Sequence, residues 1–297
     1  MKRKLAAWFW AVRPFTLPAS VVPVLVGTAL AARDGVFDTA RFVLTLLGSV
    51  LVQVGTNLVD EYSDHVTGGS EGKLLAPYKV IALGQLSSQA VRGGAVLSFG
   101  VATVIGLYLV ASTGWPLLLA CAASLVVAYG YSGGPFPLGN MGLGEPLVFV
   151  FMGLLMVMAT YYVQTIALTP EALVASLPVA CLVTAILVAN DLRDLEEDRL
   201  AGKTTPVTRF GRGFGVVLFL LLVAAAYLCV FVWVSVQPSL LPLLLVVLTL
   251  PKVRSTARLL TTRSDRTALN AGLRGSAQLH LQFGILLAVG LLLSRFV

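Results

Sequence analysis

Nine of the 14 acidic residues lie in two short segments. The first acidic segment, residues 57–71, reads NLVDEYSDHVTGGSE, and the second, residues 190–202, reads NDLRDLEEDRLAG. The two match at a constant offset of 134 residues, which pairs Asn57 with Asp191, Asp60 with Asp194, Asp64 with Asp198 and Gly68 with Gly202. Positions i, i+3 and i+7 share one face of a helix. The spacing therefore predicts two helices that each present an acidic face to a shared cavity.

The donors in these segments are carboxylate and amide oxygens, which favour a hard cation, Mg²⁺ before Ca²⁺. Mg²⁺ is commonly held by one or two carboxylates together with substrate phosphates, so the two clusters would bridge the metal to a diphosphate. The candidate metal ligands are Asp60, Glu61, Asp64, Asn190, Asp191, Asp194 and Asp198.

Basic side chains in and around the acidic segments are candidate partners for the phosphates. They are Lys73, Lys79, Arg193, Lys203 and Arg209. The alternative is that residues 191–198 form a charged cap on a helix, with internal pairs between aspartate and arginine. Two matching faces on the same predicted side of a membrane favour the metal and diphosphate interpretation.

The elements that must position these residues are membrane helices. Mean hydropathy is +0.89 over 297 residues, and apolar runs of about 17 to 25 residues recur along the chain, which is typical of membrane-spanning helices. We predict an all-α polytopic membrane protein of one domain, residues 1–297, with nine spans around a central cavity and two related helical halves. The predicted spans are 14–32, 42–60, 93–112, 115–132, 146–166, 172–190, 214–235, 239–260 and 277–296.

The basic residues predict the orientation, because Lys and Arg favour cytoplasmic loops. With nine spans, 18 of the 21 fall on one side, and only Arg33, Arg41 and Arg295 fall on the other. We therefore expect the N-terminus and both acidic segments in the cytoplasm, and the C-terminus outside. The net charge of +7 then reflects topology and contact with a lipid bilayer rather than nucleic acid. We predict that the basic N-terminus is retained rather than cleaved, because Arg13 and Pro14 interrupt its apolar run.

Four stretches of the chain resemble a known family. They are RPFTLPASVVPVLVGTALA (13–31), NLVDEYSDHVTGG (57–69), YSGGPFPLGNMGLGE (131–145) and LVANDLRDLEEDRLAGKTTPVTRFG (187–211). They resemble the UbiA superfamily of intramembrane aromatic prenyltransferases, and within it most nearly the 1,4-dihydroxy-2-naphthoate polyprenyltransferases of menaquinone biosynthesis. The resemblance implies nine transmembrane helices around a cavity that opens to the membrane of a bacterium or archaeon. It also implies Mg²⁺ and a polyprenyl diphosphate bound by two aspartate-rich motifs.

Transferred residue by residue, the resemblance implies that Asp60, Asp64, Asp194 and Asp198 carry the metal-dependent catalysis, with Lys203 contacting the diphosphate. The first motif departs from the family at Asp60-Glu61, where an Asn-Asp pair is usual, and Asn140-Met141 stand where the family has Tyr-Arg. The aromatic acceptor therefore stays open between 1,4-dihydroxy-2-naphthoate and a 4-hydroxybenzoate or homogentisate type. The candidate acceptor and cavity residues are Arg13, Asn57, Tyr129, Tyr131, Ser132 and Glu145.

Two other classes of membrane protein carry related patterns. A secondary transporter also has related halves and interrupted spans, but its carboxylates usually lie near the midplane of the bilayer rather than at span ends on one side. A membrane phosphatidyl-alcohol phosphotransferase uses spaced aspartates, but DGVFDTAR at 34–41 has the wrong spacing for its motif. Prenyl transfer is the function that the sequence favours.

Overall fold

The computed structural model describes residues 2–66, 78–134 and 136–297. Within these ranges the chain is helical, and its one β-interaction is an isolated bridge between Met141 and Thr204. The elements in chain order are α1 (Lys2–Ala11), η1 (Pro14–Thr16), α2 (Pro18–Arg33), α3 (Thr39–Val66), α4 (Ser88–Thr113), α5 (Trp115–Gly130), η3 (Leu138–Asn140), α6 (Gly144–Leu147), the π-helical η4 (Val148–Leu155), α7 (Met156–Thr165), α8 (Pro170–Leu200), α9 (Pro206–Phe210), α10 (Arg212–Val236), η5 (Pro238–Thr249), α11 (Leu250–Thr262), α12 (Arg266–Leu293) and η6 (Ser294–Phe296). The predicted all-α polytopic architecture is confirmed.

The described helices coincide with the predicted apolar runs. Seven of them are long and apolar enough to cross a membrane, and the bent pair Lys4–Thr16 and Pro18–Arg33 makes an eighth candidate. The remaining predicted run corresponds to α5, which is apolar but only 16 residues long. The number of nine spans, like the relation between the two helical halves, therefore stays a prediction.

Helix α8, which carries the second acidic segment, lies at the centre of the bundle. Its most apolar stretch is 72% buried, whereas the corresponding stretches of α3 and α4 are 22% buried. It packs against α2, α10, α12 and η4. A helix that is apolar on all sides belongs in a core, so α8 positions its polar end from within the bundle.

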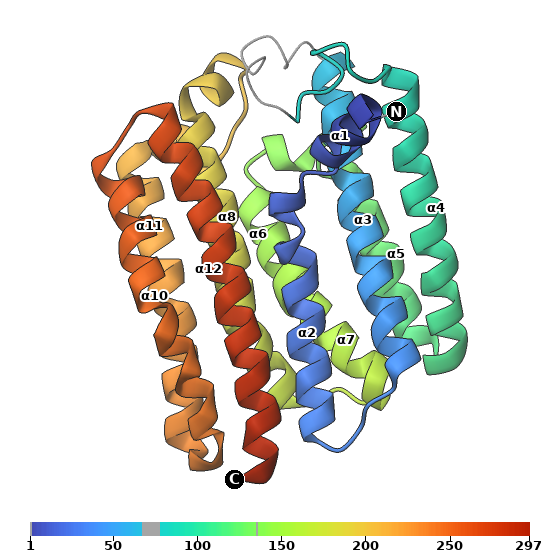
Figure 1. Cartoon of the computed structure of the whole chain (residues 1–297), viewed down its shortest axis with the longest axis vertical. Coiled ribbons are helices and arrows are strands. Elements are labelled where there is room, and N and C mark those ends of the chain that lie inside the picture. The colour runs from blue at the N-terminus through green and yellow to red at the C-terminus, as the bar shows by residue number, and fades with distance from the viewer. Residues whose placement is uncertain (1, 67–77, 135) are drawn as a thin grey trace.

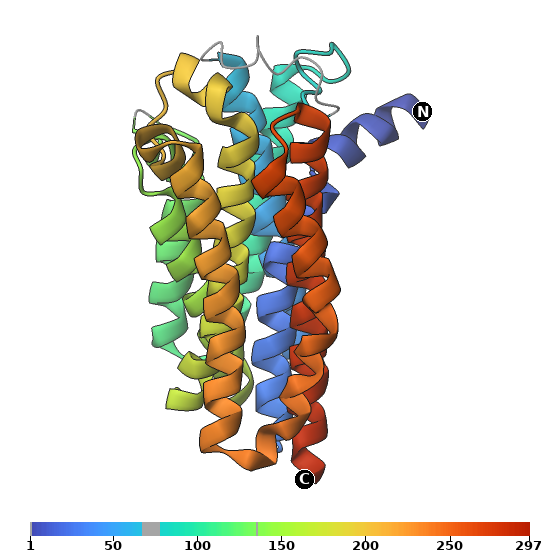
Figure 2. The same cartoon turned by 90° about the vertical axis from the view of Figure 1, so that its left-hand side faces the viewer.

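Both acidic segments reach the same end of the molecule. The last turns of α3 and α8 lie at the end of the bundle that holds the N-terminus, which we call the motif end, and the C-terminus lies at the opposite end (Figure 1). Helix α1 points away from the bundle there (Figure 2), and the pair α1 and α2 is bent by 53°. Arg13 stands in this bend with φ of 52°, a left-handed conformation that is uncommon for a residue other than glycine.

A glycine allows η4 to approach α8 closely. A Cβ atom on Gly153 would lie 2.2 Å from the Cβ and 2.3 Å from the Cα of Ala180 on α8. Membrane helices associate largely through packing of such small residues, since lipid supplies no hydrophobic driving force between helices. Helix η4 also lines the larger of two cavities described below, so this contact fixes the position of one wall of that cavity.

We expect Gly153→Ala to destabilise the protein by about 1 to 3 kcal/mol, because the added methyl group overpacks a backbone contact. Gly93→Ala on α4 is the matched control, since a Cβ there meets no atom within 4 Å. The control should be neutral or slightly stabilising, as alanine is the better helix former. Thermal unfolding of both variants in one detergent measures the difference. Equal melting temperatures would show that the close contact does not support the fold.

Candidate active site

Two adjoining cavities lie at the motif end of the bundle. The polar cavity has a volume of about 90 Å³ and is lined by Arg13, Asp60, Asp64, Tyr78, Lys79, Tyr131, Ser132, Gly139, Asn140, Leu187, Asn190, Asp191, Arg193, Asp194, Asp198, Lys203 and Thr205. The larger cavity, about 270 Å³, lies among α2, α3, α5, η4 and α8 and is mostly apolar. The two share six residues, among them Arg13, Asp60 and Asn190. A charged compartment therefore opens beside an apolar one.

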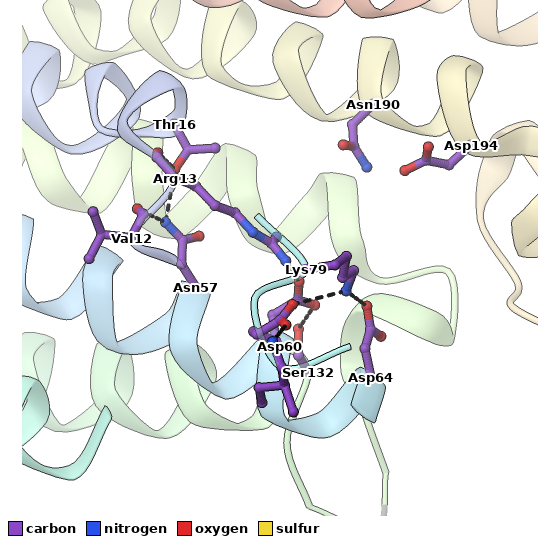
Figure 3. Close-up of polar contacts among 12 residues, drawn as sticks. Val12, Arg13, Thr16, Asn57, Asp60, Asp64, Lys79, Ser132, Asn190 and Asp194 are labelled. Carbon is purple, nitrogen blue, oxygen red and sulfur yellow. Dashed lines mark hydrogen bonds and ion pairs between the residues drawn. The ribbon is translucent and has the colours of Figure 1, made fainter. Parts of the chain in front are cut away.

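The two acidic faces meet across the polar cavity. Asp60 and Asp64 project from α3, and Asn190 and Asp194 project from α8 on the facing side (Figure 3). Asp191 and Asp198 of α8 line the same cavity. The spacing of the sequence motifs thus brings its aspartates together from two helices more than 100 residues apart, as predicted.

Both motif aspartates of α3 are paired with basic side chains from other parts of the chain. Arg13 Nη2 lies 2.6 Å from Asp60 Oδ2, and Lys79 Nζ pairs with Asp64 Oδ2. The ammonium of Lys79 also lies 3.4 Å from Glu61 Oε2, and the Lys79 side chain is only 1% exposed. These contacts tie the α1–η1 bend and the segment that begins at residue 78 to α3.

The motif aspartates of α8 are paired in the same manner. Arg193 donates from Nε and Nη2 to the two carboxylate oxygens of Asp194, at 2.7 and 2.5 Å, and from Nη2 to Asn190 Oδ1 at 2.8 Å. Lys203 Nζ lies 3.6 Å from Asp198 Oδ1. Gly202 has φ of +69° just beyond the end of α8, a conformation that favours glycine and ends the helix, and Lys203 N then bonds to Asp198 O at 2.9 Å. Asp60 and Asp194, which match in the two segments, therefore each pair with an arginine, and Asp64 and Asp198 each pair with a lysine.

The bend that holds Arg13 is fixed by Asn57. The Asn57 side-chain amide donates to Val12 O and to Thr16 Oγ1, both at 2.9 Å. These two bonds use both amide hydrogens, so Asn57 acts as a tether between α3 and the bend. The Arg13 guanidinium also stacks over the Tyr78 ring, 4.6 Å from its centroid. Backbone strain at Arg13 is thus maintained by contacts that aim its charge at the polar cavity.

The glycine-rich loop between α5 and α6 forms the remaining wall. Ser132 Oγ donates to Asp60 Oδ1 at 2.9 Å, and Thr204 N donates to Asn140 O at 2.9 Å, which joins this loop to the segment after α8. Tyr131 lines both cavities from this loop. Its hydroxyl group is therefore placed to donate a hydrogen bond to a ligand at their junction.

Comparison with known proteins identifies a family that matches most of the chain. The UbiA prenyltransferase family matches residues 20–294. The chain belongs to the UbiA prenyltransferase family. A 1,4-dihydroxy-2-naphthoate octaprenyltransferase from Bacillus subtilis (strain 168) is 31% identical over 300 residues, covering 99% of this chain and 95% of the relative. One of the same name from Haemophilus influenzae (strain ATCC 51907 / DSM 11121 / KW20 / Rd) is 31% identical over 301 residues, covering 99% of this chain and 98% of the relative.

The fold agrees with a solved structure of this family. A UbiA homologue from Archaeoglobus fulgidus bound to DMAPP and Mg²⁺ superposes with a TM-score of 0.65 at 15% identity, covering 95% of this chain and 99% of that chain. The family and its named relatives make this chain a prenyltransferase, and the apolar helices make it an integral membrane protein. The resemblance to UbiA prenyltransferases that the motifs suggested is thereby confirmed.

The UbiA motifs of this chain fit Mg²⁺ as a set of donors but do not form a preformed cage. No group of three His, Cys, Asp or Glu side chains within the described residues is arranged to hold a metal ion. Asp60, Asp64, Asp194 and Asp198 are each paired with a basic side chain, and Asp191 lies beside Glu145. Mg²⁺ usually takes only one or two carboxylates and completes its shell with water and phosphate oxygens. An all-oxygen set of this kind, around one polar cavity, matches that requirement.

Several predicted site residues of this UbiA protein lie away from the cavities. Among the residues that the structure describes, Glu61, Tyr129, Glu145 and Arg209 line neither cavity. Glu61 accepts from Ile81 N at 3.1 Å and pairs with Lys79, so it holds the segment after residue 78. Tyr129 is 55% exposed, and Arg209 stacks on Phe210, 5.4 Å from its ring centroid. Their roles stay predictions.

Two further predicted site residues are Glu145 and Lys73. Glu145 is buried beside Asp191, just behind the polar cavity. Lys73 lies outside the described residues. Sequence reasoning missed Tyr78, Asn140 and Thr205 in the polar cavity, although the first directly precedes Lys79 and the other two lie in or beside the quoted motifs. It also missed Gln53, which lines the apolar cavity two turns before Asp60.

We expect Asp194→Asn to lower prenyl transfer by about 100-fold or more, the scale of losing a main electrostatic stabiliser of a transition state. Glu196→Gln, two residues further along α8, is the matched control, because the Glu196 side chain is 80% exposed and pairs only weakly with Arg199 at 3.4 Å. Initial rates with purified variants at saturating Mg²⁺ measure both effects. Equal losses for the two variants would contradict a specific role of Asp194 in prenyl transfer.

Proposed function

We propose that this protein transfers a polyprenyl group from an allylic prenyl diphosphate to an aromatic acceptor, most specifically to 1,4-dihydroxy-2-naphthoate as in menaquinone biosynthesis, and that the reaction depends on Mg²⁺. The observation that carries the proposal is the junction of the two cavities. A diphosphate suits the charged compartment, and an isoprenoid chain with an aromatic ring suits the apolar one.

The basic residues of the polar cavity would neutralise the leaving group. Arg13, Lys79, Arg193 and Lys203 already line this cavity, and arginine binds phosphate oxygens through a planar fork of N–H donors. Mg²⁺, held by the motif aspartates, would supply further positive charge to the diphosphate oxygens. When the allylic C–O bond breaks, its electron pair leaves with the diphosphate, so these charges stabilise the product of that step.

The apolar cavity would protect the allylic cation. Its walls include Val148, Phe151 and Ile186, whose hydrocarbon side chains carry no nucleophilic lone pair and which exclude water. A carbon of the electron-rich ring then donates its π electrons to form the new C–C bond. Loss of a proton, or of the ring carboxylate as CO₂, from that carbon leaves the bonding electrons in the ring and restores aromaticity. Tyr131 lies where the two cavities meet, and its hydroxyl group would donate to a developing negative charge on the leaving diphosphate.

The names of the relatives support the finer parts of the proposal. Relatives from two bacteria, matched along nearly their whole length, are named 1,4-dihydroxy-2-naphthoate octaprenyltransferases. The homologue bound to DMAPP and Mg²⁺ supports an allylic diphosphate and this metal. We further propose that residues 1–297 form one domain and that the motif end faces the cytoplasm, as the distribution of basic residues predicts.

Purified protein in lipid nanodiscs tests the proposal directly. We supply one labelled polyprenyl diphosphate with a panel of 1,4-dihydroxy-2-naphthoate, 4-hydroxybenzoate and homogentisate, and identify products by mass spectrometry. The expected result is a prenylated product from the naphthoate with release of pyrophosphate, which stops in EDTA and returns with excess Mg²⁺. Full turnover in EDTA would contradict the metal assignment. Product from only another acceptor would contradict the naphthoate assignment.

A further inference from the structure

A row of polar side chains extends from the acidic face of α3 into the apolar cavity. Ser49, Gln53 and Thr56 line this cavity from α3, and Ser20 lines it from α2. The three α3 residues and Asp60 are spaced i, i+4, i+7 and i+11, so they share one face of the helix. We call Ser20, Ser49, Gln53 and Thr56 the polar stripe. Polar groups at such depth in a membrane protein are costly and usually serve function.

Each hydroxyl group of the polar stripe donates its hydrogen to an acceptor within the protein. Ser49 Oγ donates to Leu46 O at 2.9 Å, and Thr56 Oγ1 donates to Val52 O at 2.9 Å. Ser20 Oγ donates to Gln53 Oε1 at 3.2 Å. A hydroxyl that donates to the protein still has lone pairs to offer. The stripe therefore presents hydrogen-bond acceptors to the cavity.

Gln53 is the centre of the stripe. Its Oε1 accepts from Ser20, and its Nε2 donates to Asn57 Oδ1 at 3.2 Å. An amide nitrogen has two hydrogens, and the second has no protein partner among the described residues. Gln53 thus fixes the stripe through Asn57 to the bend that holds Arg13, and it has one donor left for a ligand.

The other polar side chains of the apolar cavity lie mostly at its junction with the polar cavity. Five of them line both cavities, Thr16 and Asn57 bond to each other, and Ser124 is the remaining one among the described residues. Most of its other walls are aliphatic, aromatic or thioether side chains, and they include Val127, Ala128, Val148, Phe151, Met152 and Ile186. A prenyl chain needs no hydrogen bonds and fits these walls. A hydroxylated aromatic ring loses hydrogen bonds to water on entering an apolar cavity and must replace them.

The polar stripe lies at a distance from Asp60 that suits an aromatic acceptor ring. At about 1.5 Å rise per residue, Thr56 lies about 6 Å and Gln53 about 10 Å from Asp60 along the helix. A two-ring acceptor against the stripe therefore has one edge beside the polar cavity, where the allylic C–O bond would break.

We infer that the polar stripe is the surface that binds the ring substituents of the aromatic acceptor and that it selects hydroxylated rings. The hydroxyl oxygens of Ser49 and Thr56 accept from the ring O–H groups, and the remaining N–H of Gln53 donates to a ring oxygen. This inference rests on the proposed function. Its physical basis is that a site built to pair with a hydroxyl group rejects an analogue without it, because the buried polar groups of the site are then left unpaired.

Gln53→Leu and Thr56→Val test the inference, with Ser98→Ala as the matched control. Ser98 is buried on α4 and donates to the carbonyl of Gly94 at 2.8 Å, as the stripe hydroxyls do within α3, but it lines neither cavity among the described residues. The substrates are 1,4-dihydroxy-2-naphthoate and 1-hydroxy-2-naphthoate, which lacks one hydroxyl group. Steady-state rates give kcat and KM for each acceptor and for the prenyl diphosphate.

We expect Gln53→Leu and Thr56→Val to raise KM for the dihydroxy acceptor about tenfold or more and to reduce its advantage over the monohydroxy acceptor. KM for the prenyl diphosphate should stay within about twofold of wild type, and Ser98→Ala should change none of these values. Unchanged acceptor KM and unchanged selectivity in both stripe variants would overturn the inference while leaving the proposed function intact. If wild type prenylates neither naphthoate, the proposed function fails and the inference fails with it.

Discussion

Four ion pairs at the ends of two buried helix faces determine how the rest of the site is arranged. A charged side chain costs about 2.5 to 3.5 kcal/mol near the bilayer centre and less toward the interface, and gathering several carboxylates adds repulsion. The chain offsets this with Arg13, Lys79, Arg193 and Lys203, which pair with Asp60, Asp64, Asp194 and Asp198 in that order. Removing one partner would leave a charge without compensation, which is strongly destabilising when the pair is buried. The α1–η1 bend, the segment that begins at residue 78 and the segment after α8 must therefore converge on the same point.

The same pairs prepare the site for an anionic substrate. Under the proposed function, a diphosphate entering the polar cavity would find the basic groups already in place, and the motif aspartates would hold the metal ion. The rest of the fold serves this geometry. Central α8 is held by close packing against η4 at Gly153, and α3 carries polar groups from Asp60 down to Ser49 along one wall of the apolar cavity. One helix face thus serves both compartments.

Much of the site could be predicted from the spacing of the motifs, because helical periodicity places Asp60 and Asp64, or Asp194 and Asp198, on one face without any knowledge of packing. Periodicity does not decide which face turns inward. Tyr129 and Tyr131 are two residues apart, about 200° around a helix, and only Tyr131 lines the cavities. Glu61, next to Asp60, points instead to the segment after residue 78. Gln53 was overlooked because a lone polar residue hardly changes the hydropathy of an apolar run, and Tyr78 because its contact with Arg13 joins distant parts of the chain.

A double-mutant cycle of Asp64→Asn and Asp198→Asn tests most directly whether the two helix faces serve one diphosphate. Asp64 lies on α3 and Asp198 on α8, and both line the polar cavity. The measured quantity is kcat/KM for the prenyl diphosphate in wild type, both single variants and the double variant. Residues that act as a unit are far from additive. We predict that the double variant loses little more than the worse single variant. Losses that multiply independently would contradict a shared site.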